Sequence, residues 1–506
     1  MRDLLFGAVQ HGGVLAMTAA QAFPGWKRRL CLTYGLTAGS IDIAHYARSA
    51  GQPFTSAEEA AFHYLARGSA RGWSPQPGFS PNDYRRDNPD TVLAGYEPFA
   101  HWLRFGRAEG RDAMVPADPP TPDMRGLLER SPRAGAGAKV DVVVPVHGGR
   151  ALTLQAIASV LEATTREACE LVVVDDASPD SRLRGELQAL AAAGLVTLLV
   201  NERNIGFVGS VNRGIGLHPD RDVVLLNSDA RVFGNWLDRL LAALRTPRTA
   251  TATPFSNAAT ILSYPATLRE NRLPADGDAV QWDRLCAALD PPLVDIPTAV
   301  GFCMAIRRSC LQQIGPFDQE RFGRGYGEEN DFCLRATAAG WRHVAVPGLF
   351  VWHCGGTSFG EQRRELIAAA QVTIEALHPG YAAAVGRFIR EDPLEPARRA
   401  LDIARVRSDP RPKRLRLGAT GVTGTPDAID IDLVPDLPPY AGQYRLVATG
   451  IGATPNLPRC GPSVSSPELA RLFEELGIQQ FEDRGGAATA AWGGRVRRAL
   501  QLIGAA

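Results

Sequence analysis

Short apolar runs alternate with amphipathic segments in the middle of the chain, and each run ends in a polar or Gly-rich turn. Between the runs, apolar residues such as Leu183, Leu187 and Leu190 recur at helical spacing. Continuous apolar strands that alternate with helices predict a parallel sheet covered on both faces, with ligands bound beyond the carboxyl ends of the strands. The predicted strands are 140–145, 170–174, 196–200 and 222–226, and the predicted helices include 235–244.

The alternation loosens after residue 253 and then returns. A strand is predicted at 300–306, a helix at 328–339 that ends at Gly340, and two strands at 341–346 and 349–352, with His353 at the tip. A long amphipathic helix follows at 361–377. The predicted fold class is therefore α/β, with a Rossmann-type, mostly parallel sheet flanked by helices.

An internal repeat precedes this region. The segment 63–72 aligns with 101–110, and each copy reads as a small helical hairpin closed by glycine. The aromatic residues Tyr64, Trp73, Tyr96 and Trp102 are interpreted first as core between the repeats and second as stacking surfaces for sugar rings. The residues before the repeat, 1–23, lack a long uncharged apolar window, which predicts neither a spanning helix nor a signal peptide.

Composition shifts divide the chain. Residues 398–416 are strongly basic and predicted to be solvated, with contact to anionic lipid or a phosphorylated acceptor as the alternative. The Gly- and Pro-rich end, 417–506, shows one plausible helix at 467–476. The predicted organisation is a helical region with two repeats at 1–115, a linker at 116–139, the sheet domain at 140–392, a basic segment and linker at 393–430, and a C-terminal segment of unassigned role at 431–506.

Overall charge narrows the class of partner. The chain of 506 residues has 55 Lys plus Arg against 54 Asp plus Glu, so no net field favours nucleic acid. Its 8 cysteines are scattered, without the paired spacing of a zinc site or a disulfide framework, which favours a reduced cytoplasm.

Acidic residues cluster where predicted strands end. Asp229, in the run 225–229, follows a buried strand and must be solvated, paired or metal-bound, since an unpaired buried charge is costly. A divalent cation that bridges Asp229 and a diphosphate would satisfy both, and His353 suits Mn²⁺ as a further ligand. The alternative for His353 is an ordinary surface or core histidine.

Three further features have two interpretations each. Asp176, in the Asp-Asp turn after the second strand, either caps a turn or accepts hydrogen bonds from a base or ribose. The Gly-rich entry 204–214 either faces a nucleotide or only packs a helix on the sheet. The cluster 325–331 either stabilises a helix N-terminus or raises the pKa of one carboxylate for proton abstraction.

Taken together, the segments 142–146, 172–176, 204–212, 225–229 and 325–335 occur in an order that resembles family 2 glycosyltransferases of the GT-A fold. The resemblance covers roughly residues 140 to 360, and the repeats resemble segments that often precede such bacterial domains. It implies inverting transfer of a hexosyl or deoxyhexosyl group, from a nucleoside diphosphate sugar to a glycan or lipid-linked acceptor. It further implies Mn²⁺ or Mg²⁺ as cofactor and a role in bacterial envelope polysaccharide synthesis, in the cytoplasm or peripheral to the membrane.

The resemblance also assigns residues. Asp229 stands for the last carboxylate of the family's Asp-x-Asp metal motif, whose first position is Asn227 here, and Glu329 stands for its general base, where the family has Asp. The implied catalytic residues are Glu329, Glu328 and Asp331; the implied metal ligands are Asp229 and His353; and the implied nucleotide-sugar contacts are Pro145, His147, Asp176, Asn204, Gly206, Phe207, Asn212, Asn227, Ser228 and Arg335.

Two other functions remain open from sequence. A nucleotidyltransferase usually has a Lys/Arg-rich phosphate loop after its first strand, where this chain has only the segment 147–150. A non-catalytic glycan-binding or scaffold protein would use the aromatic repeats and carry an inactive transferase domain, consistent with Asn227.

Overall fold

The computed structural model describes residues 31–32, 34, 36–37, 39–77, 79–87, 96–106, 121–130, 139–271, 278–323, 325–354, 363–417, 427–435, 443–485 and 487–505. The predictions for residues 1–23 and for most of the linker lie outside these ranges. Contacts divide the chain into two units, residues 1–119 and 120–506, which are described separately.

The first unit contains the two repeats. Its described helices are α4 (Ile43–Ala50), α5 (Ala57–His63), the π-helix η1 (Tyr64–Gly68), α6 (Pro81–Asp87), α8 (Pro98–His101) and the π-helix η2 (Trp102–Gly106). In each copy a buried tyrosine hydroxyl bonds a histidine Nδ1 17 residues later, Tyr46 with His63 at 2.9 Å and Tyr84 with His101 at 2.8 Å. Tyr64 is fully buried, which confirms its interpretation as core, whereas Tyr96 is 46% exposed, so the core interpretation is wrong for that residue.

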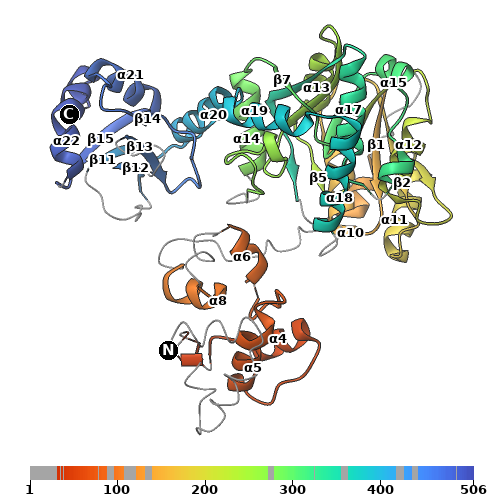
Figure 1. The fold of residues 1–506 in the computed structure, drawn as a ribbon, viewed down its shortest axis with the longest axis horizontal. Helices are drawn as coiled ribbons and strands as arrows, with labels where there is room; N and C mark the ends of the chain where they lie inside the picture. The colour runs from red at the N-terminus through yellow and green to blue at the C-terminus, as the bar shows by residue number, and fades with distance from the viewer. Residues whose placement is uncertain are drawn as a thin grey trace. The chain divides into compact units, whose positions relative to one another are not determined.

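The second unit is built on an eight-stranded sheet (Figure 1). Its strand order is β3-β2-β1-β4-β8-β6-β9-β7. The strands are β1 (Val140–Val146), β2 (Cys169–Asp175), β3 (Thr197–Val200), β4 (Asp222–Leu226), β6 (Thr249–Phe255), β7 (Val294–Ile296), β8 (Cys303–Ile306) and β9 (Arg342–Phe350). The first four are mutually parallel, as predicted, and β8 and β7 are antiparallel to their neighbours.

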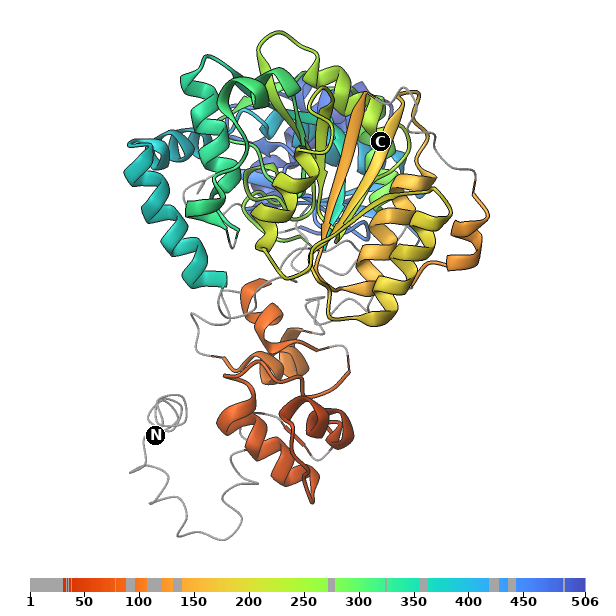
Figure 2. The same ribbon diagram turned by 90° about the vertical axis from the view of Figure 1, so that its right-hand side faces the viewer.

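Alternate side chains of the central strands enter two cores. Val142 and Val144 pack with α10 (Arg150–Glu162) and α11 (Ser181–Ala192), whereas Val143 packs with α12 (Gly206–Ile215) and α17 (Glu328–Ala338). Figure 2 shows the sheet between these two sets of helices. Because both faces are covered, the strands are apolar throughout, which explains why sequence pattern predicts them well.

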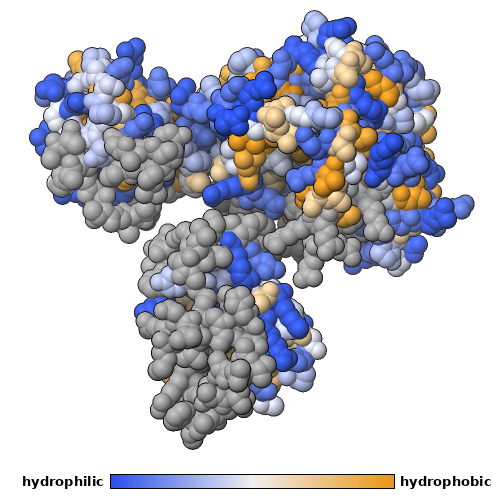
Figure 3. Space-filling view, in the orientation of Figure 1, coloured by the Kyte–Doolittle hydropathy of each residue, from blue (hydrophilic) through white to orange (hydrophobic). Residues whose placement is uncertain are grey.

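The remaining helices surround the sheet. They are α9 (Met124–Leu128), α13 (Trp236–Leu244), η3 (Thr260–Leu262), α14 (Asp278–Leu289), α15 (Arg308–Ile314), α16 (Gln319–Phe322), α18 (Arg363–Leu377), α19 (Tyr381–Glu391) and α20 (Glu395–Ser408). The surface over α18 mixes apolar and polar side chains (Figure 3), and Val372 on this helix is 73% exposed. None of the described helices is long and apolar enough to cross a bilayer.

The C-terminal part contains a second sheet, of five strands in the order β14-β13-β12-β11-β15. These are β11 (Lys413–Leu417), β12 (Ile429–Pro435), β13 (Tyr444–Thr449), β14 (Arg459–Cys460) and β15 (Ile478–Asp483), packed with α21 (Ser466–Leu476) and α22 (Ala487–Leu502) around a core of their own. The helix predicted at 467–476 is confirmed, and the sheet was not predicted.

The prediction that residues 398–416 are solvated is wrong. Arg398, Arg405 and Arg416 are at most 6% exposed. Arg416 pairs with Asp430 and Asp432 of β12, and Arg405 pairs with Asp402. Sequence charge density misled this prediction because each of these buried guanidinium groups has a carboxylate partner, which sequence spacing alone does not reveal.

Candidate active site

The carboxyl ends of β1, β2 and β4 meet at one edge of the sheet, because these strands are parallel and in register. Pro145 lies inside β1 opposite Val174, and His147 follows the strand in an exposed position. Asp176 follows β2 and Asn227 follows β4. Polar side chains thus gather where a doubly covered sheet binds its ligands.

Asp176 holds the turn that starts α12. One oxygen of its buried carboxylate accepts hydrogen bonds from Asn201 Nδ2 and from the backbone N–H of Ile205, both at 2.8 Å. The other oxygen accepts from the N–H of Gly206 at 3.0 Å. Asp176 therefore caps the turn. Its second oxygen can still accept one more hydrogen bond, so the structure also allows the interpretation that Asp176 binds a base or ribose.

His147 and Asn204 come together above this turn. His147 Nδ1 lies 2.8 Å from the carbonyl oxygen of Asp176, so Nδ1 carries the proton and donates it. Its Nε2 then accepts from Asn204 Nδ2 at 3.2 Å, and Asn204 Oδ1 accepts from the N–H of Gly206. Phe207 is half-buried at the first turn of α12.

Gly206 has no room for a side chain. Its φ is +83°, and a Cβ there would lie 2.3 Å from the carbonyl oxygen of Gly323. The start of α12 and the loop that leads to α17 therefore approach each other backbone to backbone.

Asn212 and Arg335 hold the loop between α15 and α16. Asn212 Nδ2 donates to the carbonyl of Phe317 at 2.8 Å, and its Oδ1 accepts from the N–H of Phe317 at 3.1 Å. Arg335 donates to the carbonyls of Ile314 and Pro316, at 2.7 and 2.9 Å. Through these hydrogen bonds, Asn212 of α12 and Arg335 of α17 stabilise the conformation of this loop.

Asp331 is the centre of an ion-pair group. It accepts from Arg335 Nε at 2.7 Å, one helical turn later, and its other oxygen lies 2.9 Å from His378 Nε2. Asp331 is 3% exposed. Its contacts anchor α17 to the loop before it and to the end of α18, so it positions the helix that starts with Glu328 and Glu329.

Asp229 and His353, which are far apart in sequence, face each other. The short strands β5 (Ala230–Arg231) and β10 (Trp352–His353) pair antiparallel beyond the end of β4. His353 Nε2 lies 3.3 Å from Asp229 Oδ1 and 3.5 Å from Asn227 Nδ2. Ser228 is half-buried in the turn that joins β4 to β5.

His353 is held in a defined tautomer. Its Nδ1 lies 2.7 Å from the carbonyl oxygen of Ala258 and so donates a proton to it. The other nitrogen of the neutral ring then points a lone pair at a carboxylate oxygen, and only a shared proton or a cation makes that contact favourable. Burial lowers the pKa of His353, but the charge of Asp229 and the hydrogen bond to it outweigh burial and raise the pKa.

These two side chains fit a hard divalent cation. Adjacent ligand atoms around Mg²⁺, each about 2.1 Å from the ion, lie roughly 3 Å apart, close to the separation seen here. A histidine that donates Nδ1–H to a backbone carbonyl is also the usual form of a metal-ligating imidazole. Asn227 adds a polar neighbour without charge.

Glu328 and Glu329 form a buried carboxyl pair at the start of α17. Three successive residues with positive φ, Gly325, Tyr326 and Gly327, lead the chain into them. Their carboxyl groups hydrogen-bond each other, and one oxygen of each is buried without a partner among the described residues. Such orphaned polar atoms are rare in folded proteins and point to a function.

The two glutamates differ in proton affinity. Burial, and then the charge of Glu329, raise the pKa of Glu328 well above its usual range. Burial also raises the pKa of Glu329, but backbone N–H groups and the hydrogen bond from Glu328 oppose the rise. The pKa is therefore raised more at Glu328 than at Glu329.

A short loop connects the glutamate helix to the Asp229–His353 pair. Phe302 stacks on the ring of His353, with centroids 5.3 Å apart, and its carbonyl accepts from the N–H of Asn227. Three residues earlier, the N–H of Ala299 donates to Cys333 Sγ on α17. Residues 299–302 thus link the Asp229–His353 pair to the helix that begins with Glu328 and Glu329.

Sequence reasoning missed Asn257, which follows β6 and bonds the backbone of His353. β6 runs parallel to β4, since both pair antiparallel with β8, so Asn257 emerges at the same edge as Asp229. A polar residue just after a strand was the available signal. This signal was missed because β6 was not predicted as a strand. Its sequence, TATATP, consists of small residues and a proline and does not resemble the valine-rich strands.

The opposite edge of the sheet has a second cluster of possible ligands, Asp141, Glu170 and His218. Arg221 Nη1 already lies 2.9 Å from Asp141 and 2.6 Å from Glu170. A fixed guanidinium thus occupies the position a metal would need, and the cluster serves as an ion-pair network.

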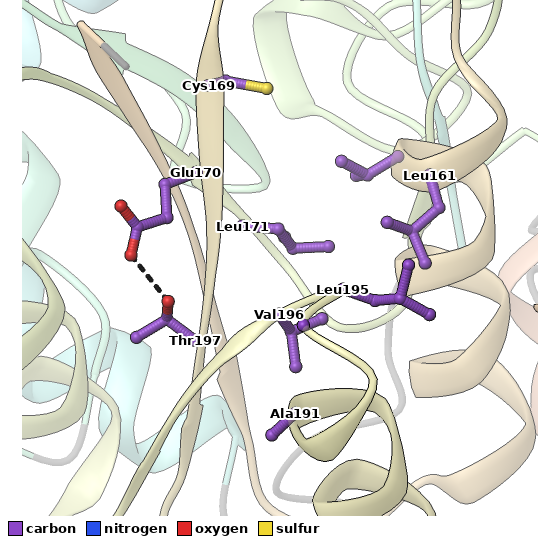
Figure 4. A pocket seen from close by; sticks show the side chains of 10 residues that line it. Leu161, Cys169, Glu170, Leu171, Ala191, Leu195, Val196 and Thr197 are labelled. Atoms are coloured by element: carbon purple, nitrogen blue, oxygen red, sulfur yellow. Dashed lines mark hydrogen bonds between the residues drawn. The ribbon is translucent and has the colours of Figure 1, made fainter. Parts of the chain in front are cut away.

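A cavity of about 290 Å³ lies beside that cluster, between α10, α11 and the first residues of β2 and β3. Figure 4 shows Leu161, Leu171 and Leu195 directed into it, whereas Glu170 points away and bonds Thr197. The cavity lies at the amino end of β2 and is therefore separate from the Asp229 edge.

A mostly parallel sheet covered by helices on both faces, with acidic residues beyond the carboxyl ends of its strands, is the fold of GT-A glycosyltransferases. Residues 141–315 match the family described as "Glycosyl transferase family 2", and the chain contains a domain of that family.

Two curated relatives align with this region. The N-acetylglucosaminyl-diphospho-decaprenol L-rhamnosyltransferase of Mycobacterium tuberculosis is 28% identical over 232 residues, which cover 41% of this chain and 74% of the relative. The N-acetylgalactosaminyltransferase 7 of Drosophila melanogaster is 23% identical, over 43% of this chain and 37% of its own length.

Two solved structures are also similar. GalNAc-T7 with UDP, GalNAc and Mn²⁺ has 22% identity and a TM-score of 0.34, over 43% of this chain and 44% of that chain. The mannosyltransferase PcManGT from Pyrobaculum calidifontis, in complex with GDP-Man and Mn²⁺, has 15% identity and a TM-score of 0.37, over 56% and 79%. At these scores the likeness adds nothing to the fold described above.

Proposed function

We propose that the protein is an inverting, metal-dependent glycosyltransferase that moves a sugar from a nucleoside diphosphate sugar to a hydroxyl of a glycan or lipid-linked acceptor. The observation that carries the proposal is the Asp229–His353 pair at the carboxyl edge of the sheet. The curated mycobacterial relative, named for transfer of L-rhamnose to a lipid-linked sugar, supports the choice of acceptor class.

Asp229 and His353 would hold Mn²⁺ or Mg²⁺. When bound, such an ion neutralises charge that builds on the leaving diphosphate. Asp176 with its spare acceptor, Pro145, His147, Asn204, Gly206 and Phe207 would line the base and ribose, with Asn227 and Ser228 near the diphosphate. Asn212, Asp331 and Arg335 would act through the loops that they hold.

Glu329 would act as general base. The acceptor oxygen forms a bond to the anomeric carbon on the face opposite the diphosphate, the bond from that carbon to the diphosphate oxygen breaks, and its electron pair leaves with the nucleoside diphosphate. Glu329 takes the hydroxyl proton. Because burial raises the pKa of Glu328 more than that of Glu329, Glu328 would keep its proton and donate it in a hydrogen bond to Glu329, which suits this role.

The sheet domain at 140–392 would perform this reaction, with the repeats at 1–115, the linker at 116–139 and the segments at 393–430 and 431–506 as accessory parts. A location at the inner face of the bacterial membrane follows from the proposed lipid-linked acceptor, and a role in envelope polysaccharide synthesis follows with it.

Donor hydrolysis tests the proposal. Purified protein with Mn²⁺ is incubated with uridine, thymidine and guanosine diphosphate sugars, and released nucleoside diphosphate is measured. We expect slow release from at least one donor, loss of release in Asp229→Ala, and no change in Asp220→Ala, the same substitution at an exposed aspartate. Absence of release from every donor by folded protein would favour a binding module.

A further inference from the structure

The segment Ser256–Asn271, which follows β6, holds His353 in place. Asn257 Nδ2 donates to the carbonyl of His353 at 2.8 Å, and Asn257 Oδ1 accepts from the N–H of His353 at 2.9 Å. The carbonyl of Ala258 accepts from the imidazole at 2.7 Å. Both backbone groups of His353 and its inner ring nitrogen are therefore fixed by two consecutive residues.

The segment is closely bonded within itself. The N–H of Tyr264 donates to the carbonyl of Ser256 at 2.8 Å, next to Asn257. Asn271 closes the other end, since its N–H and its Nδ2 both donate to the carbonyl of Asn257, at 2.8 and 3.1 Å. A displacement of Tyr264 is thus passed to Asn257 through one backbone hydrogen bond.

The far side of Tyr264 meets α20. Tyr264 is fully buried, and its hydroxyl donates to Asp402 at 2.5 Å. Arg405 Nη1 donates to the same hydroxyl at 3.0 Å, and its guanidinium lies over the Trp282 ring at 4.4 Å. Asp402 is completely buried, so its charge depends on these donors.

The same carboxylate is bonded from the C-terminal part of the chain. Asn456 donates to Asp402 from its N–H at 2.8 Å and from Nδ2 at 3.0 Å, and its Nδ2 also donates to the carbonyl of Pro265. Arg405 in turn donates to the carbonyls of Ile451 and Ala453. The loop 451–456 therefore contacts the segment Ser256–Asn271 directly, and it also contacts this segment through Asp402 and Arg405 of α20.

We propose that Asn257 is a positioning residue for the metal site, and that the C-terminal part of the chain sets the affinity of that site through the Asn456–Asp402–Tyr264 contacts. The inference rests on the proposed function, because it concerns the same Asp229–His353 pair. It assigns the C-terminal sheet a role as a support that keeps His353 oriented toward Asp229.

Mn²⁺ binding tests this role without any donor or acceptor. Full-length protein is titrated with Mn²⁺ alone, and free Mn²⁺ is followed by its electron paramagnetic resonance signal, well below the melting temperature of each variant. We expect Asn257→Ala to weaken Mn²⁺ binding about 10- to 100-fold, as loss of a residue that orients a ligand usually does. Tyr264→Phe, which keeps the ring and loses only the hydroxyl, should weaken binding several-fold.

Tyr46→Phe is the matched control, because it removes a buried tyrosine hydroxyl with one histidine partner in the first unit. It should bind Mn²⁺ like the wild type. Wild-type affinity in both Asn257→Ala and Tyr264→Phe, with binding lost in Asp229→Ala, would overturn the positioning role and leave the proposed function standing. Wild-type affinity in Asp229→Ala would overturn both.

Discussion

The two edges of the main sheet each have buried acidic residues and a histidine, yet they differ in how their charges are balanced. At the amino edge, Arg221 bonds both Asp141 and Glu170, and Thr197 bonds Glu170 as well. At the carboxyl edge, Asp229 faces a histidine, and the carboxyl pair of Glu328 and Glu329 leaves two buried oxygens without partners among the described residues.

This difference is the one expected between a structural cluster and the proposed reactive one. A carboxylate that already bonds a guanidinium gains little from a further ligand. A buried carboxyl oxygen without a hydrogen-bond partner among the described residues, as in Glu328 and Glu329, is stabilised by a proton, a cation or a substrate hydroxyl. The ligand-like geometry of the amino-edge cluster therefore says less about function than the unmet hydrogen bonds at the carboxyl edge.

The largest expected effect is at Glu329. Glu329→Gln keeps the size of the side chain and removes the base, so turnover should fall by about 10²- to 10⁴-fold, measured as sugar transfer or nucleoside diphosphate release. Glu320→Gln, the same change at an exposed glutamate of α16, is the control and should leave turnover unchanged. Near-normal turnover in Glu329→Gln would assign the base elsewhere.

A substitution at the amino edge should lower the stability of the protein and leave its turnover unchanged. Arg221→Met leaves Asp141, which is completely buried, without its cation, so we expect the free energy of unfolding to fall by about 3–5 kcal/mol. Chemical denaturation measures this change. Turnover per folded molecule should stay at the wild-type level; a selective loss of turnover without a loss of stability would contradict the assignment of this edge as structural.

A smaller effect concerns pH. Burial raises the pKa of Glu329, so the acid limb of kcat/KM should lie above the usual range of a glutamate, and activity should be lost as pH falls through it. Glu328→Ala removes the hydrogen bond that opposes the rise and should move this limb to higher pH. Glu328→Gln keeps a donor and should move it less. If the acid limb of kcat/KM lies at the same pH in both variants, the ionisation of Glu329 does not depend on a hydrogen bond from residue 328.

The smallest expected effect is on the pH dependence of stability at Glu328. The pKa of Glu328 is raised in the folded protein, mainly by burial, so its contribution to stability is full below the unfolded pKa and is lost as pH rises toward the folded pKa. Glu328→Gln should therefore be more stable than the wild type at neutral pH and equal to it in acid. Thermal melting across this range measures the difference, and a constant difference would contradict it.

The sheet and its acidic turns could be predicted because both faces are covered, so that valine-rich strands such as β1 stand out and their ends mark one edge. The pairing of Asp229 with His353 was predicted from their positions at strand ends together with the family pattern. What sequence could not provide was which polar groups are already satisfied. Asn212 and Arg335 look like ligand contacts and are engaged by backbone carbonyls, while the basic residues of α20 look solvated and are buried against Asp402 and Asp392.

Gly206 has a consequence for how this domain can vary. The start of α12 and the loop that leads to α17 leave no space for a side chain at Gly206, since any Cβ would clash with the Gly323 carbonyl. A library randomised at this turn should return glycine almost alone, even if the exposed neighbour Arg203 accepts many residues. Engineers who wish to widen the proposed donor site would therefore need to redesign both loops together.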